Sequence, residues 1–266
     1  MKKFNSFNSA PAFSNGFNGY GFNRPPMGTP AYPPVPAVRR QANVDTSALA
    51  INTATRVPVV LVLDISSSMS GQPIDELNRG VAEYYQTLAQ DEKAHYAAET
   101  CVVTFASDVN CVREFTTADE CPAAPAAFRA SGMTCMGEAV NLALDKLEAR
   151  IAEYRSHGVP YHRPWLVLMT DGMPNGSASE LERAVSRVRE KLGANVLQTI
   201  PIAIGTGADN TCLARFSADG MPYRLDAMNF RSFFNWLSAS VTEVSRQSAG
   251  VNQDIDRARC TWNEVN

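Results

Sequence analysis

The feature that most constrains this chain is an apolar segment followed directly by a run of carboxylate and hydroxyl side chains. Residues 57–63 are almost entirely apolar, and residues 64–71 then read Asp-Ile-Ser-Ser-Ser-Met-Ser-Gly. A short apolar run bounded by polar residues is typical of a strand buried in a parallel sheet. An amphipathic stretch begins near Pro73. The polar run is therefore predicted to lie where a strand ends and a helix begins.

The polar run offers oxygen atoms at alternating positions. These are the carboxylate of Asp64 and the hydroxyls of Ser66 and Ser68. Hard oxygen ligands suit Mg²⁺ or Mn²⁺ better than Zn²⁺. We expect Mg²⁺ or Mn²⁺ here rather than Ca²⁺. The segment therefore predicts a metal site that keeps a coordination position open.

Strand-like and helix-like patterns alternate from about residue 56 to residue 250. We predict strands over 57–63, 100–105, 109–115, 165–170, 196–204 and 223–225, and helices over 74–88, 136–154, 180–192, 212–216 and 230–247. The second and third strands flank a three-residue turn and are expected to form a hairpin. The fold class is therefore α/β, with a mostly parallel central sheet, one antiparallel edge strand and helices on both faces.

Two further loops carry oxygen donors in the same order around this sheet. Thr134 lies just before a predicted helix, and Asp171 follows the strand that ends at Thr170. In parallel sheets ligands bind at the carboxyl ends of the strands, near the topological switch point. We therefore predict one metal site made of Asp64, Ser66, Ser68, Thr134 and Asp171.

Helix capping is the alternative explanation for the hydroxyl groups, because a serine or threonine can satisfy the free N–H groups of a first helical turn. We assign that role to Ser70. Thr134 alone could equally be a cap. Because Thr134 and Asp171 recur at the expected places, we interpret Thr134 and the first loop as metal ligands.

The two ends of the chain differ from its middle. Residues 1–50 contain repeated Phe-Asn units followed by a proline-rich run, and are predicted to be a disordered extension. The proline-rich run could also dock as a polyproline II helix, although such runs are common in linkers. Residues 251–266 are interpreted as a C-terminal tail. The predicted domain therefore spans 56–250.

Charge and composition exclude some classes of function. Residues 1–45 hold five of the 24 basic side chains and one of the 27 acidic ones, which leaves the remainder with a net charge of −7. Nucleic-acid binding needs clustered basic side chains, so it is not expected.

There is no apolar run long enough for a membrane span, and no apolar core follows Lys2 and Lys3 as in a signal peptide. Six cysteines without a Cys-x-x-Cys pair are interpreted as reduced, and the location as cytoplasmic.

The order Asp-x-Ser-x-Ser, then Thr, then Thr-Asp-Gly resembles the metal-ion-dependent adhesion site of von Willebrand factor A domains. The resemblance implies a Rossmann-like sheet in which the hydroxyls bind the metal directly. It also implies that Asp64 and Asp171 act at least partly through water. A protein partner would then offer an Asp or Glu carboxylate to the open position.

Three further segments are similar to bacterial von Willebrand factor A proteins of the TerY/YegL type. They are residues 161–174, residues 205–209 and residues 230–241. That resemblance implies a role in tellurium resistance, stress response or phage defence. It also implies a PP2C-like phosphatase and a serine/threonine kinase-like protein as partners.

Three functions remain open on the sequence. The first is a non-catalytic, metal-dependent adaptor that binds proteins, which we favour because no nucleophile–base pair is recognisable beside the site. The second is a Mg²⁺-dependent phosphohydrolase, which would usually carry a second Asp where Ser66 stands. The third is an extracellular adhesion domain. Assembly through the Phe-Asn repeats rests on composition alone.

Overall fold

The computed structural model describes residues 51–225 and 229–248. The predicted N-terminal extension and C-terminal tail lie outside these residues. The described elements are, in chain order, β1 (Val57–Asp64), η1 (Ser67–Met69), α2 (Gln72–Gln90), α3 (Ala94–Ala97), β2 (Ala98–Phe105), β3 (Val109–Thr117), α4 (Met136–His157), β4 (Trp165–Thr170), α5 (Ala178–Gly193), β5 (Gln198–Ile204), α6 (Asn210–Ala214), β6 (Tyr223–Leu225) and α7 (Phe230–Ser245).

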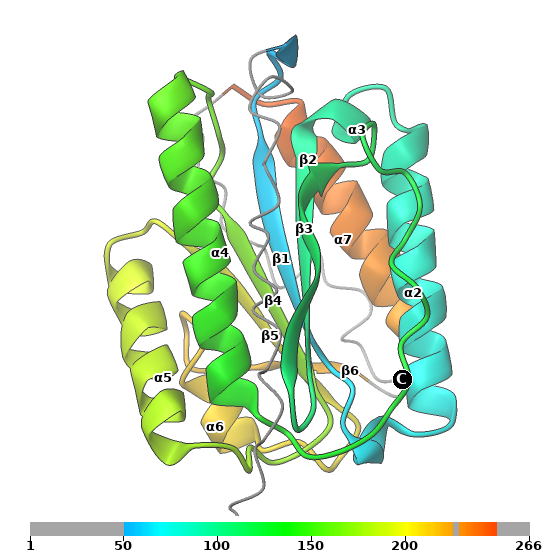
Figure 1. The fold of residues 1–266 in the computed structure, drawn as a ribbon, viewed down its shortest axis with the longest axis vertical. Coiled ribbons are helices and arrows are strands. Elements are labelled where there is room, and N and C mark those ends of the chain that lie inside the picture. Colours follow the sequence, from blue (N-terminus) through cyan, green and yellow to red (C-terminus); the bar gives the residue numbers. More distant parts are fainter. Residues whose placement is uncertain (1–50, 226–228, 249–266) are drawn as a thin grey trace, which may run out of the picture. The chain divides into compact units, whose positions relative to one another are not determined.

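The strands form a six-stranded sheet in the order β3-β2-β1-β4-β5-β6. All neighbouring strands are parallel except β2 and β3, which pair antiparallel at the edge. Figure 1 shows the hairpin of β2 and β3 beside the parallel strands. The predicted fold class is confirmed, including its single antiparallel edge strand.

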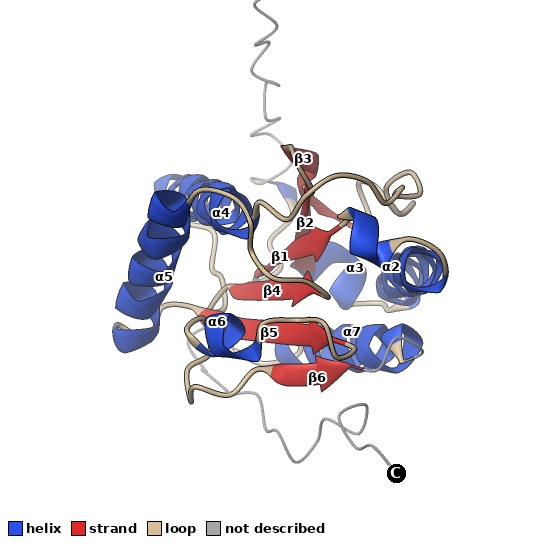
Figure 2. Cartoon of the chain, turned by 90° about the horizontal axis from the view of Figure 1, so that it is seen from below, coloured by secondary structure: helices blue, strands red, loops and turns tan. Residues whose placement is uncertain are grey.

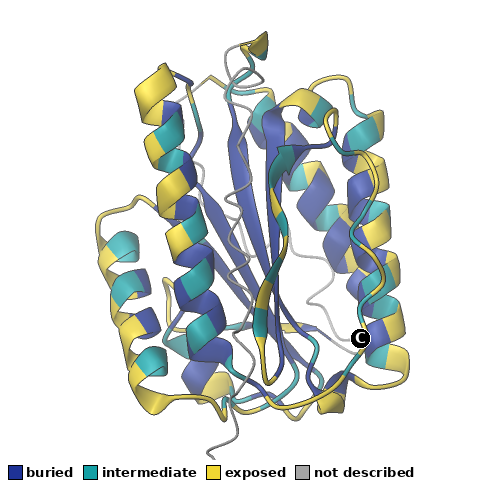
Figure 3. Cartoon of the chain, in the orientation of Figure 1, coloured by how far each residue is buried: buried dark blue, intermediate teal, exposed yellow. Residues whose placement is uncertain are grey.

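Alternating side chains of the strands build two apolar cores, one on each face of the sheet. In β1, Val59 and Leu61 pack with α2 and α7, whereas Val60 and Val62 pack with α4 and α5. Figure 2 shows these two helical layers on opposite sides of the sheet. Burial on both faces explains why the central strands read as unbroken apolar runs, and Figure 3 shows them buried along their length.

The structure corrects several predicted boundaries. The strand predicted to begin at 196 begins at Gln198, because Asn195 adopts a positive φ of 55° and the chain turns there. The helix predicted over 212–216 is Asn210–Ala214, because the Asp209 side chain accepts a hydrogen bond from the Cys212 N–H and caps it earlier. The short elements η1 and α3 were not predicted.

Figure 3 also shows that the long helices are buried on one side and exposed on the other. Within residues 51–225 and 229–248, no helix has the length and apolar character needed to cross a bilayer.

Candidate metal centre

The first predicted ligand, Asp64, is the last residue of β1 and is fully buried. Its Oδ1 accepts a hydrogen bond of 2.7 Å from the Ser66 N–H, and its Oδ2 accepts one of 2.5 Å from the Thr170 hydroxyl. Leu63 pairs with Met169 in the parallel register of β1 and β4, so the following residues, Asp64 and Thr170, are also neighbours. The strand pairing therefore fixes the carboxylate at the carboxyl edge of the sheet.

The hydroxyls of the first loop approach the second carboxylate. Ser66 Oγ lies 3.0 Å from Ser68 Oγ, which in turn donates a hydrogen bond of 2.6 Å to Asp171 Oδ1. Two oxygens at right angles around Mg²⁺, each at about 2.1 Å, are about 3 Å apart. The spacing of the two serine hydroxyls therefore matches one edge of a magnesium octahedron.

Thr134 also reaches this cluster. A Cβ atom placed on Gly172 would lie 3.5 Å from Thr134 Oγ1 and 3.7 Å from Ser68 Oγ, so Gly172 sits against both hydroxyls. The Thr134 side chain is 4% exposed. All five predicted ligands thus lie on three neighbouring loops.

Hydrogen bonds between the loops hold them together. The Ser131 N–H donates to the Ile65 carbonyl at 2.8 Å, which joins the first loop to the second. The Thr134 N–H donates to Asn175 Oδ1 at 2.6 Å, and the Asn175 N–H returns to the Thr134 carbonyl at 3.1 Å. The second loop is therefore joined to the third, and the oxygen donors are positioned by the backbone.

Two residues that position the site were missed by the sequence reasoning. Thr170 orients Asp64, and Asn175 orients the Thr134 backbone. Thr170 belongs to the Thr-Asp-Gly segment and adjoins a predicted ligand, so its role could have been anticipated. Asn175 follows that segment in a loop and carries no local signal.

The capping explanation does not account for the hydroxyls. Ser66 is the N-cap of η1, but its side chain makes no capping hydrogen bond. Gly71 is the N-cap of α2, so the assignment of Ser70 as its cap was wrong. Cys135, not Thr134, is the N-cap of α4, and it makes no capping bond with its side chain.

The two carboxylates of the site make it favourable for a cation. Burial raises the pKa of Asp64, against hydrogen bonds from Ser66 and Thr170, and the charge of Asp171 raises it further. Burial likewise raises the pKa of Asp171, against the hydrogen bond from Ser68. Ionising both carboxylates is therefore costly, and a bound cation would offset that cost.

Hydroxyl oxygens are essential to any metal bound here. Within the part of the chain that the structure describes, no group of three or more His, Cys, Asp or Glu side chains could hold a metal ion. Three hydroxyls and two carboxylates, with water completing the shell, are the oxygen-rich donor set that Mg²⁺ or Mn²⁺ prefers. The residues present therefore fit such an ion.

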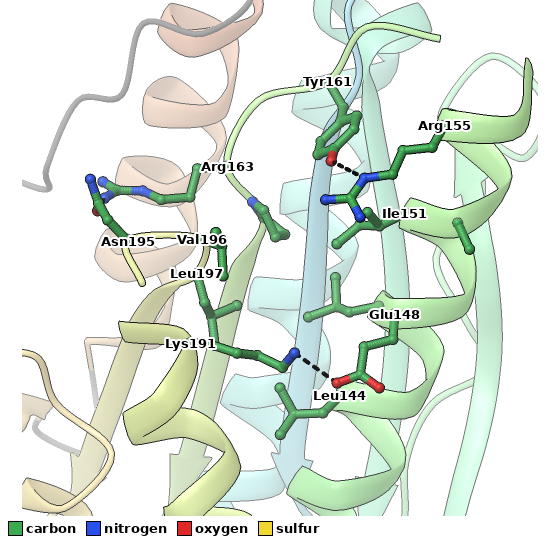
Figure 4. A pocket seen from close by; sticks show the side chains of 13 residues that line it. Leu144, Glu148, Ile151, Arg155, Tyr161, Arg163, Lys191, Asn195, Val196 and Leu197 are labelled. Carbon is green, nitrogen blue, oxygen red and sulfur yellow. Dashed lines mark hydrogen bonds and ion pairs between the residues drawn. The ribbon is translucent and has the colours of Figure 1, made fainter. Parts of the chain in front are cut away.

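A cavity of about 660 Å³ lies at the opposite end of the strands from the candidate metal centre, where β4 and β5 begin. Figure 4 shows side chains of α4 and α5 around it, including the ion pair between Lys191 and Glu148. None of the five predicted ligands lines it. The candidate metal centre is therefore a surface site distinct from this cavity.

No curated protein matches this sequence significantly. The family model "von Willebrand factor type A domain" matches residues 59–235.

Several solved structures share the fold. The von Willebrand factor domain of the type V pili tip protein Mfa5 from Porphyromonas gingivalis has a TM-score of 0.56 and 12% identity, over 75% of this chain and 99% of that one. A von Willebrand factor type A protein from Catenulispora acidiphila has a TM-score of 0.51 and 18% identity, over 71% of this chain and 43% of that one. Proximal thread matrix protein 1 from the mussel byssus has a TM-score of 0.50 and 16% identity, over 73% of this chain and 47% of that one.

This chain spans less than half the length of the mussel and Catenulispora proteins. At these identities the likeness shows the fold alone. The family model, in contrast, covers well over half of the sequence and includes the loops that carry all five predicted ligands. This chain therefore belongs to the von Willebrand factor type A domain family.

Proposed function

We propose that this chain is a non-catalytic, metal-dependent protein-binding module that acts as an adaptor. The observation that carries the proposal is the position of Ser68 Oγ, 3.0 Å from Ser66 Oγ and 2.6 Å from Asp171 Oδ1. Hydroxyl and carboxylate oxygens from two loops therefore lie close together at one point of the surface. Such a cluster can hold a metal and still leave room for a ligand from another protein.

The metal we propose is Mg²⁺ or Mn²⁺. Ser66, Ser68 and Thr134 would bind it through their hydroxyls, while Asp64 and Asp171 would act at least partly through water. When bound, the ion would attract a carboxylate, because neutral direct ligands leave it electrophilic. The partner is therefore expected to present an Asp or Glu side chain.

Two exposed methionines beside the site support a protein partner. Met133 directly precedes Thr134 and is 52% exposed, and Met173 directly follows Gly172 and is 65% exposed. Methionine side chains are flexible and polarizable, and they adapt to varied protein surfaces. Methionine is enriched at protein interfaces relative to the rest of the surface, so this pair favours a protein partner.

The environment of Asp64 disfavours the phosphohydrolase alternative. Both of its carboxylate oxygens accept hydrogen bonds, and the side chain is fully buried. An attacking carboxylate must reach its substrate in a suitable orientation. We therefore propose that Asp64 positions the site and the metal rather than attacking a phosphate.

The finer assignment rests on the motifs of the TerY/YegL type. We propose a cytoplasmic role in a bacterial or phage system for stress response or tellurium resistance, with a PP2C-like phosphatase and a serine/threonine kinase-like protein as candidate partners. The pilus protein compared above shares only the fold at its identity. No adhesion role is carried over from it.

Metal binding can be tested by calorimetric titration with Mg²⁺ and Mn²⁺. Ser68→Ala should weaken binding at least about tenfold, because it removes one direct ligand. The matched control is Ser70→Ala, which changes an exposed serine of the same segment outside the cluster. If both variants and the unchanged protein bound Mg²⁺ and Mn²⁺ with equal affinity, the proposal of a metal site at Ser68 would be contradicted.

Partner binding needs a second experiment that separates the metal from the interface. The full chain would capture its partners from cell extract with Mg²⁺ or with EDTA, and capture should depend on Mg²⁺. Met173→Ser should reduce capture while leaving the calorimetric affinity for Mg²⁺ unchanged. Capture that is equal with EDTA would refute a metal-dependent adaptor.

A further inference from the structure

Two cysteines face one another across the antiparallel edge of the sheet. Cys101 lies on β2 and Cys111 on β3, and their sulfur atoms are 3.8 Å apart. Cys111 pairs in register with Val103, two residues along from Cys101, so both cysteines lie on the face that α4 covers. A disulfide bond is about 2.05 Å long, so the two sulfurs would have to approach by less than 2 Å.

The two thiols differ in their access to solvent. Cys101 is fully buried, whereas Cys111 is only partly buried. β3 is the edge strand, where side chains are less covered than in the centre of the sheet. A small reagent can therefore reach Cys111 more readily than Cys101.

Their hydrogen bonding also makes the two thiols unequal. A hydrogen bond from Cys101 lowers the pKa of Cys111, against the effect of burial and of the Glu114 charge, and the Lys146 ammonium lowers it further. The same contact, together with burial, raises the pKa of Cys101 well above its usual value. The Arg113 carbonyl, 3.2 Å from the Cys111 sulfur, favours the protonated form. On balance Cys111 is the better nucleophile, because the thiolate is the reactive form.

We propose that Cys101 and Cys111 form a reversible oxidation site, in which a peroxide oxidises Cys111 and Cys101 then closes a disulfide. In the first step the Cys111 thiolate attacks hydrogen peroxide. An S–O bond forms, the O–O bond breaks, and hydroxide leaves and is protonated to water. In the second step the Cys101 sulfur attacks the sulfenic acid. The S–S bond forms, and the hydroxyl leaves with the Cys101 proton as water. The two thiols together lose two electrons, and the peroxide gains them.

This site is separate from the proposed metal-dependent function. It lies within the hairpin, and none of its residues is a predicted metal ligand. A reducing dithiol would restore both thiols by exchange.

The sequence allows a direct test by peptide mapping. Trypsin cleaves after Lys93 and Arg113, and no Lys or Arg lies between them, so residues 94–113 form one peptide that holds both cysteines. The full chain would be treated with hydrogen peroxide, alkylated and digested. We expect this peptide to lose two hydrogen atoms, to resist alkylation, and to recover both alkylation sites after dithiothreitol.

Variants that fold as judged by circular dichroism separate the roles of the two thiols. In Cys101→Ser, Cys111 should accumulate as a sulfenic acid that a dimedone probe captures. In Cys111→Ser, the buried Cys101 should stay unmodified. The matched control Cys121→Ser should close the disulfide as readily as the unchanged protein.

Three results would overturn the proposal. The first is that both thiols of the peptide remain open to alkylation at peroxide doses that oxidise other cysteines of the chain. The second is a cross-link from Cys111 to Cys121 in place of one to Cys101. The third is equally fast oxidation of Cys101 in Cys111→Ser, which would remove Cys111 as the first point of attack.

Discussion

At the scale of single residues, the placement of the five oxygen donors was predictable because each lies at the end of a strand or between a strand and the next long helix. The apolar run before Asp64 and the strand before Asp171 fix where those side chains emerge. Asn175 was not predictable, because its amide reaches Thr134 from another loop, 41 residues away in the sequence. Local patterns indicate which residues lie at an edge, but not which distant side chain orients them.

A buried ion network is another residue-scale feature without a local signal. Glu99 accepts hydrogen bonds from Arg56 at 2.8 Å, Arg150 at 2.6 Å and the Tyr154 hydroxyl at 2.7 Å. Arg56 and Glu99 are each 1% exposed. The network joins three separate parts of the chain, namely Arg56 before β1, Glu99 on β2, and Arg150 with Tyr154 on α4, so tertiary packing brings them together.

Changing Glu99→Gln should therefore destabilise the domain by about 3–5 kcal/mol, because it leaves buried positive charge uncompensated. Urea unfolding followed by circular dichroism measures this free energy. Glu182→Gln, at an exposed ion pair with Arg215, should leave the unfolding midpoint nearly unchanged. Similar midpoints for the two variants would contradict the structural role of the network.

His162 gives the domain a predictable dependence on pH. Its side chain is 2% exposed, neither ring nitrogen has a hydrogen-bond partner among the described residues, and burial lowers its pKa. In the unfolded chain its pKa is about 6.5. Below that value the unfolded state binds the proton more readily than the native state. The stabilising effect of the neutral ring is therefore complete above about pH 6.5 and is lost as the pH falls toward the native pKa.

We expect His162→Phe to reduce the slope of unfolding free energy against pH below about pH 6.5, by at most about 1.4 kcal/mol per pH unit. Urea unfolding at several pH values measures the slope. An unchanged slope in His162→Phe would assign the pH dependence to other groups.

At the scale of elements, hydrophobic periodicity predicted every strand and every long helix, because both faces of the sheet are buried. Short elements escaped prediction. The 3₁₀ turn Ser67–Met69 follows from the closing of the first loop, and Ala94–Ala97 is one turn held by the Asp91 side chain, which accepts from the Lys93 and Ala94 N–H groups. Neither segment is long enough to show a period.

The hairpin also supports the candidate metal centre. The Ser107 hydroxyl in its turn accepts a hydrogen bond of 3.0 Å from the Met133 N–H. Gly132 has a φ of +78°, and a Cβ there would lie 2.6 Å from Ser107 Oγ. Only glycine therefore allows the loop before Thr134 to rest on the hairpin.

The contact between α4 and α5 depends on a second close approach. A Cβ on Gly137 would lie 2.6 Å from the Leu181 Cα. We expect Gly137→Ala to destabilise the domain by about 1–3 kcal/mol, because backbone must move to accept the methyl group. Thermal unfolding measures the effect. Gly193→Ala has no neighbouring atom within 4 Å and should be neutral or stabilising by up to about 1 kcal/mol. Equal losses in both variants would argue against the close packing.

At the scale of the whole described domain, the strand order brings the three oxygen-bearing loops to one edge. β1 and β4 are adjacent although two strands and two long helices separate them in the sequence. Asp64 and Asp171 therefore meet at a topological switch point, where α/β sheets bind ligands. This arrangement is the central reason to expect a metal at the surface of this von Willebrand factor type A domain.

The most direct test is a crystal structure of the full chain soaked in Mn²⁺, with the ion located by its anomalous scattering. We expect one anomalous peak within about 2.2 Å of Ser66 Oγ and Ser68 Oγ, and its loss in crystals of Ser68→Ala. An anomalous peak only elsewhere in the chain, or none at a saturating Mn²⁺ concentration, would contradict a metal centre at these loops.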